Sequence, residues 1–253
     1  MIDWIMVQEQ RLDLELSSLE NYLLSLEEFM FEKQLLIKEN FSEFKTVKLE
    51  NEDYAQVLED SYIEEYQSFS KRYPNKLRLA LLLETYTVLE SYLTKVCILL
   101  KDSLLLSKEL PKRPNLSNLE IYLTTNCTVN FDKFNPEWTF IENIRLIRNL
   151  IAHGHGSLEI KESKEVGTKK EENKKQKEKE KIAKITTFIL NHQDITVMEN
   201  EEDLKSTKEK EPKEGIYNIH LPSMKLNIEF IKKIRSFASK ISNVTFIAKD
   251  GRC

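Results

Sequence analysis

The sequence predicts a mainly α-helical bundle with a small inserted β-hairpin and a C-terminal helix. Of its 253 residues, 40% are hydrophobic and 32% are charged, and the 5 Gly and 6 Pro are too few turn residues for an all-β fold. Apolar residues recur at helical spacing in long segments before residue 156. After residue 156 the composition becomes strongly polar, and two short segments alternate polar and apolar residues as strands do.

The first forty residues are expected to form one long helix. Their apolar residues alternate four and three apart, without Pro or Gly, so they form a narrow seam with a period of about 3.5 residues. Such a seam faces either the core of a bundle or the surface of a dimer or partner. The residues of this seam are Leu12, Leu16, Leu19, Leu23, Leu26 and Met30.

Two further helices are expected before residue 110. The first spans Asp53–Ser70 and should end near Tyr73-Pro74, because proline disfavours helical geometry in the residue before it. The second spans Lys76–Lys108 and is apolar over more than half of its circumference, which predicts a central position in the bundle. Of its two carboxylates, Glu84 is expected to face solvent, whereas Glu90 faces either solvent or a site on another helix.

A short helix near residues 116–125 and an irregular segment, 126–136, lead to a helix that begins after Asn135-Pro136-Glu137. Asn can cap a helix, Pro suits its first turn, and Glu is favoured there by the helix dipole. Gly154 and Gly156 are expected to end this helix. Its apolar side consists of Trp138, Ile141, Ile144, Ile147 and Ile151.

The end of this helix carries the most informative residues, Arg148-Asn149-Leu150-Ile151-Ala152-His153. Arg148 supplies a permanent positive charge for a phosphate, and His153 can transfer protons near neutral pH. On a regular helix the two side chains are about 140° apart, whereas Asn149 and His153 face the same way. For Arg148 and His153 to act on one phosphate, either His153 leaves helical geometry near the glycines, or two copies of the helix meet and pool their residues.

This stretch resembles the R-N-x-x-x-H motif of HEPN domains, which are small all-helical modules, many of them RNases. Val-Leu-Glu-Ser-Tyr-Leu at 88–93 resembles the segment in which these domains often carry an acidic residue that faces the active-site helix. The resemblance covers roughly residues 50–156. It implies an antiparallel helical bundle and a homodimer whose site forms across a two-fold interface between the motif helices.

What the resemblance implies for activity is a metal-independent endoribonuclease. A 2′-hydroxyl of RNA would attack the neighbouring phosphate with His153 as general base or acid. Arg148 would stabilise charge on the phosphoryl oxygens, Asn149 would orient His153 or the phosphate, and Glu90 would face the motif helix. The products would be a 2′,3′-cyclic phosphate and a 5′-hydroxyl.

Four further residues are candidates for binding RNA. Arg145 lies one turn before Asn149 and could bind the RNA backbone, although it could also be a plain surface charge. His155 follows a glycine in an expected loop and could equally be only solvated. Lys232 and Lys233 belong to a basic outer face of the last helix, which is expected at Asn227–Ile241.

Between the motif and the last helix lies an insertion. Lys161–Lys181 contains nine Lys and six Glu, so it is expected to be a loop or a solvated helix. Ile182–Met198 and Gly215–Leu226 are expected to be the strands of a hairpin, and they carry His192 and His220. The predicted organisation is therefore a long N-terminal helix (1–50), a HEPN-like helical core with the motif (51–156), a charged linker with the hairpin (157–226) and a C-terminal helix (227–253) that returns to the bundle.

Composition excludes several classes of protein. The net charge of −4 confines any nucleic-acid site to a local patch. Cysteines 97, 127 and 253 are unclustered, which fits buried or free thiols better than disulfides or zinc, so no metal and no cofactor is expected. No export signal or apolar run of about 18 residues is found, which predicts a cytoplasmic protein without a membrane partner.

Two functions remain open at this stage. The first, which rests on the resemblance, is an RNase that serves as a toxin or an antiviral defence effector, with an antitoxin or regulatory protein as a further partner. The second is a non-catalytic HEPN-like helical module that binds a partner protein or a nucleotide. A Gly-rich phosphate loop, a nucleophile elbow and an HExxH motif are all absent from the sequence.

Overall fold

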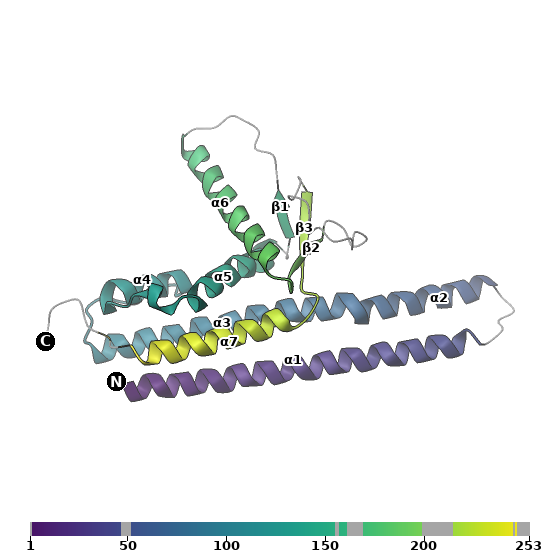
Figure 1. Cartoon of the computed structure of the whole chain (residues 1–253), viewed down its shortest axis with the longest axis horizontal. Coiled ribbons are helices and arrows are strands. Elements are labelled where there is room, and N and C mark those ends of the chain that lie inside the picture. Colours follow the sequence, from purple (N-terminus) through teal and green to yellow (C-terminus); the bar gives the residue numbers. More distant parts are fainter. Residues whose placement is uncertain are drawn as a thin grey trace.

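Two long helical rods, packed side by side, form the base of the structure (Figure 1). The computed structural model describes residues 2–46, 52–154, 157–160, 169–198, 215–244 and 246. The first rod is α1 (Ile2–Phe44). The second consists of α2 (Glu52–Gln67), the π-helical turn η1 (Ser68–Arg72) and α3 (Tyr73–Ser103). The mainly α-helical class expected from the sequence is confirmed.

The apolar seam of α1 faces the core, as one of the two interpretations of its spacing predicts. Leu12, Leu16 and Leu23 are almost fully buried, and α1 packs along the central helix α3. On α3, residues spaced three or four apart are buried along the whole length of the helix, which explains its central position. Glu84 is exposed, as expected.

The expected end of a helix at Tyr73-Pro74 is wrong, because the rod continues through this point. Pro74 has no N–H to donate, and its ring would collide with the carbonyl four residues earlier in a regular helix. The chain solves this with a wider turn, in which the Tyr73 N–H donates to the oxygen of Ser68, five residues earlier. The π turn therefore keeps α2 and α3 nearly in line (Figure 1).

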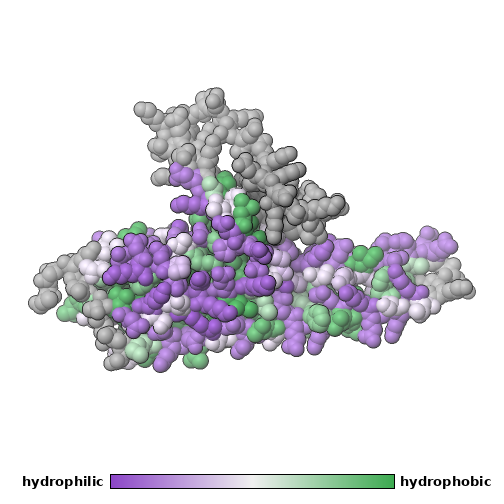
Figure 2. Space-filling view, viewed as in Figure 1, coloured by the Kyte–Doolittle hydropathy of each residue, from purple (hydrophilic) through white to green (hydrophobic). Residues whose placement is uncertain are grey.

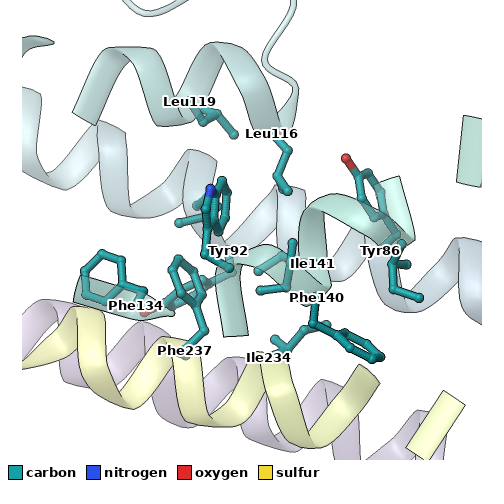
Figure 3. Packing of buried hydrophobic residues seen from close by; sticks show 14 of the residues in the cluster. Tyr86, Tyr92, Leu116, Leu119, Phe134, Phe140, Ile141, Ile234 and Phe237 are labelled. Atoms are coloured by element: carbon teal, nitrogen blue, oxygen red, sulfur yellow. The ribbon is translucent and has the colours of Figure 1, made fainter. Parts of the chain in front are cut away.

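Three helices and a short turn complete the bundle. They are α4 (Leu116–Cys127), the 3-10 turn η2 (Phe131–Phe134), α5 (Glu137–Gly154) and α7 (Lys225–Ser242). The end of α5 at Gly154 and the return of the C-terminal helix are as expected. Figure 3 shows side chains of α5 and α7 meeting between these helices. In this region Trp138 and Phe134 both contact the ring of Phe237, at centroid distances of 5.3 Å.

A smaller unit rises from the bundle beside the end of α5 (Figure 1). It consists of α6 (Lys169–Asn191) and an antiparallel sheet of β1 (Ser157–Ile160), β3 (Gly215–His220) and β2 (Thr196–Met198), in the order β1-β3-β2. Val197 pairs with Ile219, which confirms the hairpin, and Leu158 pairs with Tyr217 in a third strand that the sequence did not predict.

The strand expected over Ile182–Met198 is wrong for most of its length, because α6 continues to Asn191. Ile185 and Ile189 are two of the alternating residues that favoured a strand, but they are also one helical turn apart. With Phe188 they form the buried side of α6. The Lys-rich part of the insertion is therefore helical from Lys169 onward, whereas its first residues lie outside the described part of the chain.

One buried cation joins the two rods to the smaller unit. The Arg78 guanidinium on α3 donates to both carboxylate oxygens of Glu27 on α1, at 2.5 and 2.6 Å, and to the carbonyl of Leu221 at 2.9 Å. Asn227 of α7 donates to the carbonyl of Arg78, and Asn75 accepts from the Leu221 N–H.

Within the described residues, no helix is both long and apolar enough to cross a membrane.

Replacement of Arg78 by alanine should lower the free energy of unfolding by about 3 kcal/mol, because Glu27 would keep a mostly buried charge without its partner. The matched control is Arg72→Ala, which removes a pair with Glu64 whose side chains are 42% and 74% exposed. Its cost should stay below about 1 kcal/mol. Urea denaturation of both variants measures this, and equal costs would contradict the role given to Arg78.

Candidate functional site

The motif lies in the last two turns of α5, which remains helical through Gly154. The backbone of residue 153 is therefore helical, so the first route to convergence of Arg148 and His153, a departure from helical geometry, is not used. The side chain of His153 and all of His155 lie outside the described part of the structure. Thr139 and Ala152 are the exposed residues of α5 over 137–152, and the others are buried or half-buried.

Arg148 is held in place by two neighbours. Its Nη1 donates to Oδ1 of Asn149 at 3.2 Å, and the guanidinium carbon lies 5.5 Å from the centroid of the Tyr86 ring on α3. A guanidinium over an aromatic face at this distance is attracted by the ring quadrupole. Tyr86 is only 2% exposed, and its burial raises the pKa of the phenol, so the ring stays neutral beneath the cation. No described carboxylate forms an ion pair with Arg148.

Glu90 lies one turn after Tyr86 on α3 and binds the start of α4. Its Oε1 accepts from the N–H of Leu116, the first residue of α4, at 3.1 Å. Burial raises the pKa of Glu90, and this rise is opposed by the Leu116 hydrogen bond and by the charge of Arg148. Glu90 is therefore half-buried, in the field of Arg148, and it satisfies a backbone donor that α4 itself cannot satisfy.

Arg145 is bound to a carboxylate of its own helix. Its Nε and Nη2 lie 3.0 and 2.7 Å from the two oxygens of Glu142. Glu120 on α4 accepts from Trp138 Nε1 at 3.1 Å, and burial together with the charge of Glu142 raises its pKa. Three carboxylates, including Glu90, therefore accompany Arg145 and Arg148, so this part of the surface is not a strongly positive patch.

The basic face expected on α7 is largely used to hold the bundle together. Arg235 binds α1 through Asp13 and Glu20, each at 2.7 Å, and Lys240 binds Glu137 of α5 at 2.6 Å. The remaining basic residues of this face are Lys232, which is exposed, and Lys233. Lys233 Nζ lies 6.0 Å from the ring of Phe140, whose position on α5 is about 12 Å along the axis from Arg148.

No group of three or more His, Cys, Asp or Glu among the described residues could hold a metal ion. The Nδ1 atom of His192 lies 2.8 Å from the carbonyl oxygen of Phe188. Burial lowers the pKa of His220, and the nearby charges of Arg78 and Lys71 lower it further. Cys97 and Cys127 are buried and free, as expected, and burial raises their pKa values to about 12 and about 11.

A hollow in the described surface lies away from the motif. It has a volume of about 360 Å³ and lies between α4 and η2. Its lining includes Glu120, Thr124, Asn130 and Asp132, and it contains neither Arg148 nor Asn149.

Comparison with known proteins found no relative. No protein-family model matches the chain. No curated protein and no solved structure matches it either. What can be said of the site therefore comes from its residues and their arrangement.

Sequence reasoning singled out Arg148, Asn149 and Glu90, which the structure places near one another, but it did not single out Tyr86 or Glu142. Tyr86 belongs to the apolar stripe of α3, and this stripe by itself predicts only a position in the core. Its spacing of one turn from Glu90 was the available indication, because residues four apart share a helix face. Glu142 lies three residues before Arg145, the spacing of an ion pair on a helix.

A pH series should show the effect of burying Glu90. Because burial raises its pKa, the folded protein binds the proton of Glu90 more tightly than the unfolded chain does, so ionisation costs stability as the pH rises through and above the ordinary value of 4.5. Glu90→Gln keeps an oxygen for the Leu116 N–H and removes the charge. The free energy of unfolding of this variant, relative to wild type, should therefore rise between about pH 4 and about pH 7.

Urea denaturation at each pH measures this difference. The matched control is Glu84→Gln, because Glu84 is exposed on the same helix. The same pH dependence for both variants would contradict the environment described for Glu90.

Proposed function

We propose that the protein is a metal-independent endoribonuclease of the HEPN type. The observation that carries this proposal is the setting of Arg148, whose guanidinium lies over the Tyr86 ring, is hydrogen-bonded to Asn149 and forms no ion pair with a described carboxylate. A guanidinium held in place in this way is suited to bind a phosphate by paired N–H donors. His153 follows on the same helix, in the spacing of the R-N-x-x-x-H motif.

The reaction needs only these groups and the RNA. The 2′-hydroxyl oxygen attacks the adjacent phosphorus and gives up its proton, the bond to the 5′-oxygen breaks, and that oxygen takes a proton. His153 serves as the base or the acid in these transfers. Arg148 donates to the non-bridging oxygens, on which negative charge grows in the transition state. The products are a 2′,3′-cyclic phosphate and a 5′-hydroxyl.

Two chains are proposed to share each site. Arg148 and His153 are five residues apart on a continuous helix, so their backbone positions are about 140° apart around its axis. Ala152 is exposed in the last turn of α5, between these two residues, and offers a place where a second copy could approach. In such a dimer the Arg148 of one protomer and the His153 of its partner would act on the same phosphate.

We further propose that the enzyme works in the cytoplasm as a toxin or an antiviral defence effector, controlled by an antitoxin or a regulatory protein. The support for this role is the family resemblance of the motif.

A second candidate, a non-catalytic module that binds a partner protein or a nucleotide, is favoured by one observation. The carboxylates of Glu90, Glu120 and Glu142 near Arg148 disfavour the close approach of a long polyanion.

Incubation of purified protein with total RNA and tRNA in EDTA tests the proposal. Wild type should cut RNA and leave cyclic phosphates, whereas Arg148→Ala and His153→Ala should each cut at least about 100-fold more slowly. The matched control is Arg113→Ala, which removes an exposed cation outside the motif and should leave the rate unchanged. Equal cutting by wild type and His153→Ala would refute the site, and no cutting by wild type would favour the second candidate.

The proposed dimer makes a separate prediction. Ala152→Glu should raise the dimer dissociation constant at least about 100-fold, because the two-fold axis would bring like charges together. Thr139→Glu, at the other exposed position within residues 137–152, is the matched control and should leave the constant unchanged. Sedimentation equilibrium measures both, and a wild-type monomer at all concentrations would overturn the shared site.

A further inference from the structure

The far end of the two rods is a two-helix projection, which we call the arm and define as residues 28–46 and 52–67. In Figure 1 it extends beyond the point at which α7 begins. Within it, Phe41 and Phe44 of α1 contact the ring of Tyr62 of α2, at 5.5 and 5.6 Å. At the base of the arm, Gln34 of α1 donates to the carbonyl of Phe69 in η1 at 3.0 Å. These contacts hold the two helices together, but they form no closed core.

Burial in the arm is incomplete. Ile37 is the one buried residue of the arm, and α2 has none. Figure 2 shows hydrophobic residues in green among the hydrophilic ones on this end of the molecule. Apolar side chains this numerous on one projection mark a surface that another protein covers. Those that are 44% to 63% exposed are Phe29, Phe31, Leu35, Leu36, Tyr54, Val57 and Ile63.

The exposed apolar face of α1 continues the face that α7 covers. Arg235 of α7 binds three residues of α1 that are spaced four and three apart, namely Asp13, Ser17 and Glu20. Residues spaced three, four or seven apart share one side of a helix. Extended toward the arm at such spacings, this side carries Leu24, Phe31 and Leu35, which are 43%, 59% and 50% exposed. The side of α1 that α7 contacts therefore continues beyond the start of α7, where its apolar residues are exposed.

The charges of the arm indicate the chemistry of what covers it. The arm carries ten carboxylates and three lysines, and α2 has six carboxylates and no basic residue. The three lysines lie over aromatic rings of the arm itself, Lys33 over Phe29, Lys38 over Tyr66 and Lys45 over Phe41. A second copy of the arm would bring like charges together, whereas Lys and Arg would be attracted.

We propose that the arm binds a basic amphipathic α-helix of a partner protein, which lies along α1 and continues the course of α7. The apolar side of that helix would cover Phe31 and Leu35, and its Lys or Arg residues would meet the carboxylates of the arm, as Arg235 meets Asp13 and Glu20. The proposal does not depend on ribonuclease activity, because it uses neither α5 nor the motif.

Binding of two synthetic helical peptides to the full chain tests this proposal. Both have the same leucine stripe, and one carries Lys where the other carries Glu. By fluorescence anisotropy the Lys peptide should bind at least about tenfold more tightly than the Glu peptide. Its affinity should fall as the salt concentration is raised from about 50 to about 300 mM.

The site is located by a double variant and a matched control. Phe31→Asp with Leu35→Asp should weaken binding of the Lys peptide at least about tenfold, although it adds negative charge. The control Leu14→Asp, at a residue of α1 that is 72% exposed outside the arm, should not weaken it. Unchanged binding by the double variant would overturn the proposal. A wild-type dimer that this variant converts to a monomer would also overturn it, in favour of a second copy.

Discussion

The buried guanidinium of Arg78 is the contact on which the arrangement of the helices depends. It binds Glu27 of α1 and the carbonyl of Leu221, directly after β3, while the backbone carbonyl of Arg78 accepts from Asn227 of α7. A charge in such a setting is stable only when its donors are satisfied, so these bonds fix where the chain leaves the sheet and enters the bundle. From that point α7 runs between α1 and α5, and Lys240 at its far end binds Glu137 in the first turn of α5. The motif helix is therefore positioned from both of its ends, by the aromatic contacts of α7 and by the ring of Tyr86.

The same arrangement separates two surfaces with different chemistry. Toward the end of α5, the half-buried guanidinium of Arg148 lies near carboxylates that are held by Leu116, Trp138 and Arg145. Along the arm, apolar and acidic side chains lie on a helix pair that α7 does not reach (Figure 1). The first surface suits a phosphate group bound by a few fixed donors, and the second suits a basic helix. A protein with both could act on one macromolecule while another protein holds or controls it.

Helical periodicity was sufficient to predict the bundle, but not the points where two periods or two local rules compete. The spacing of Ile185 and Ile189 fits both a strand and a helix. The segment is helical, and a helix also brings Phe188 to the same buried side. Pro74 correctly marked an irregularity, yet a π turn absorbed it, because packing against α1 on both sides favours a continuous rod. For the site, the motif could be read from residue types. The pairing of Arg145 with Glu142 and the bond from Leu116 to Glu90 depend on side-chain geometry and on the arrangement of helices that are far apart in the sequence.

The central claim is that Arg148 and His153 act together from two chains, and complementation tests it most directly. Arg148→Ala and His153→Ala proteins are each inactive under this account, but a mixed dimer contains one site with the Arg148 of one chain and the His153 of the other. Equilibrated mixtures of the two inactive proteins should therefore regain RNA cleavage, up to about one quarter of the wild-type rate per chain if the subunits exchange at random. If each variant is inactive and the mixture stays inactive although mixed dimers form, the shared site is wrong.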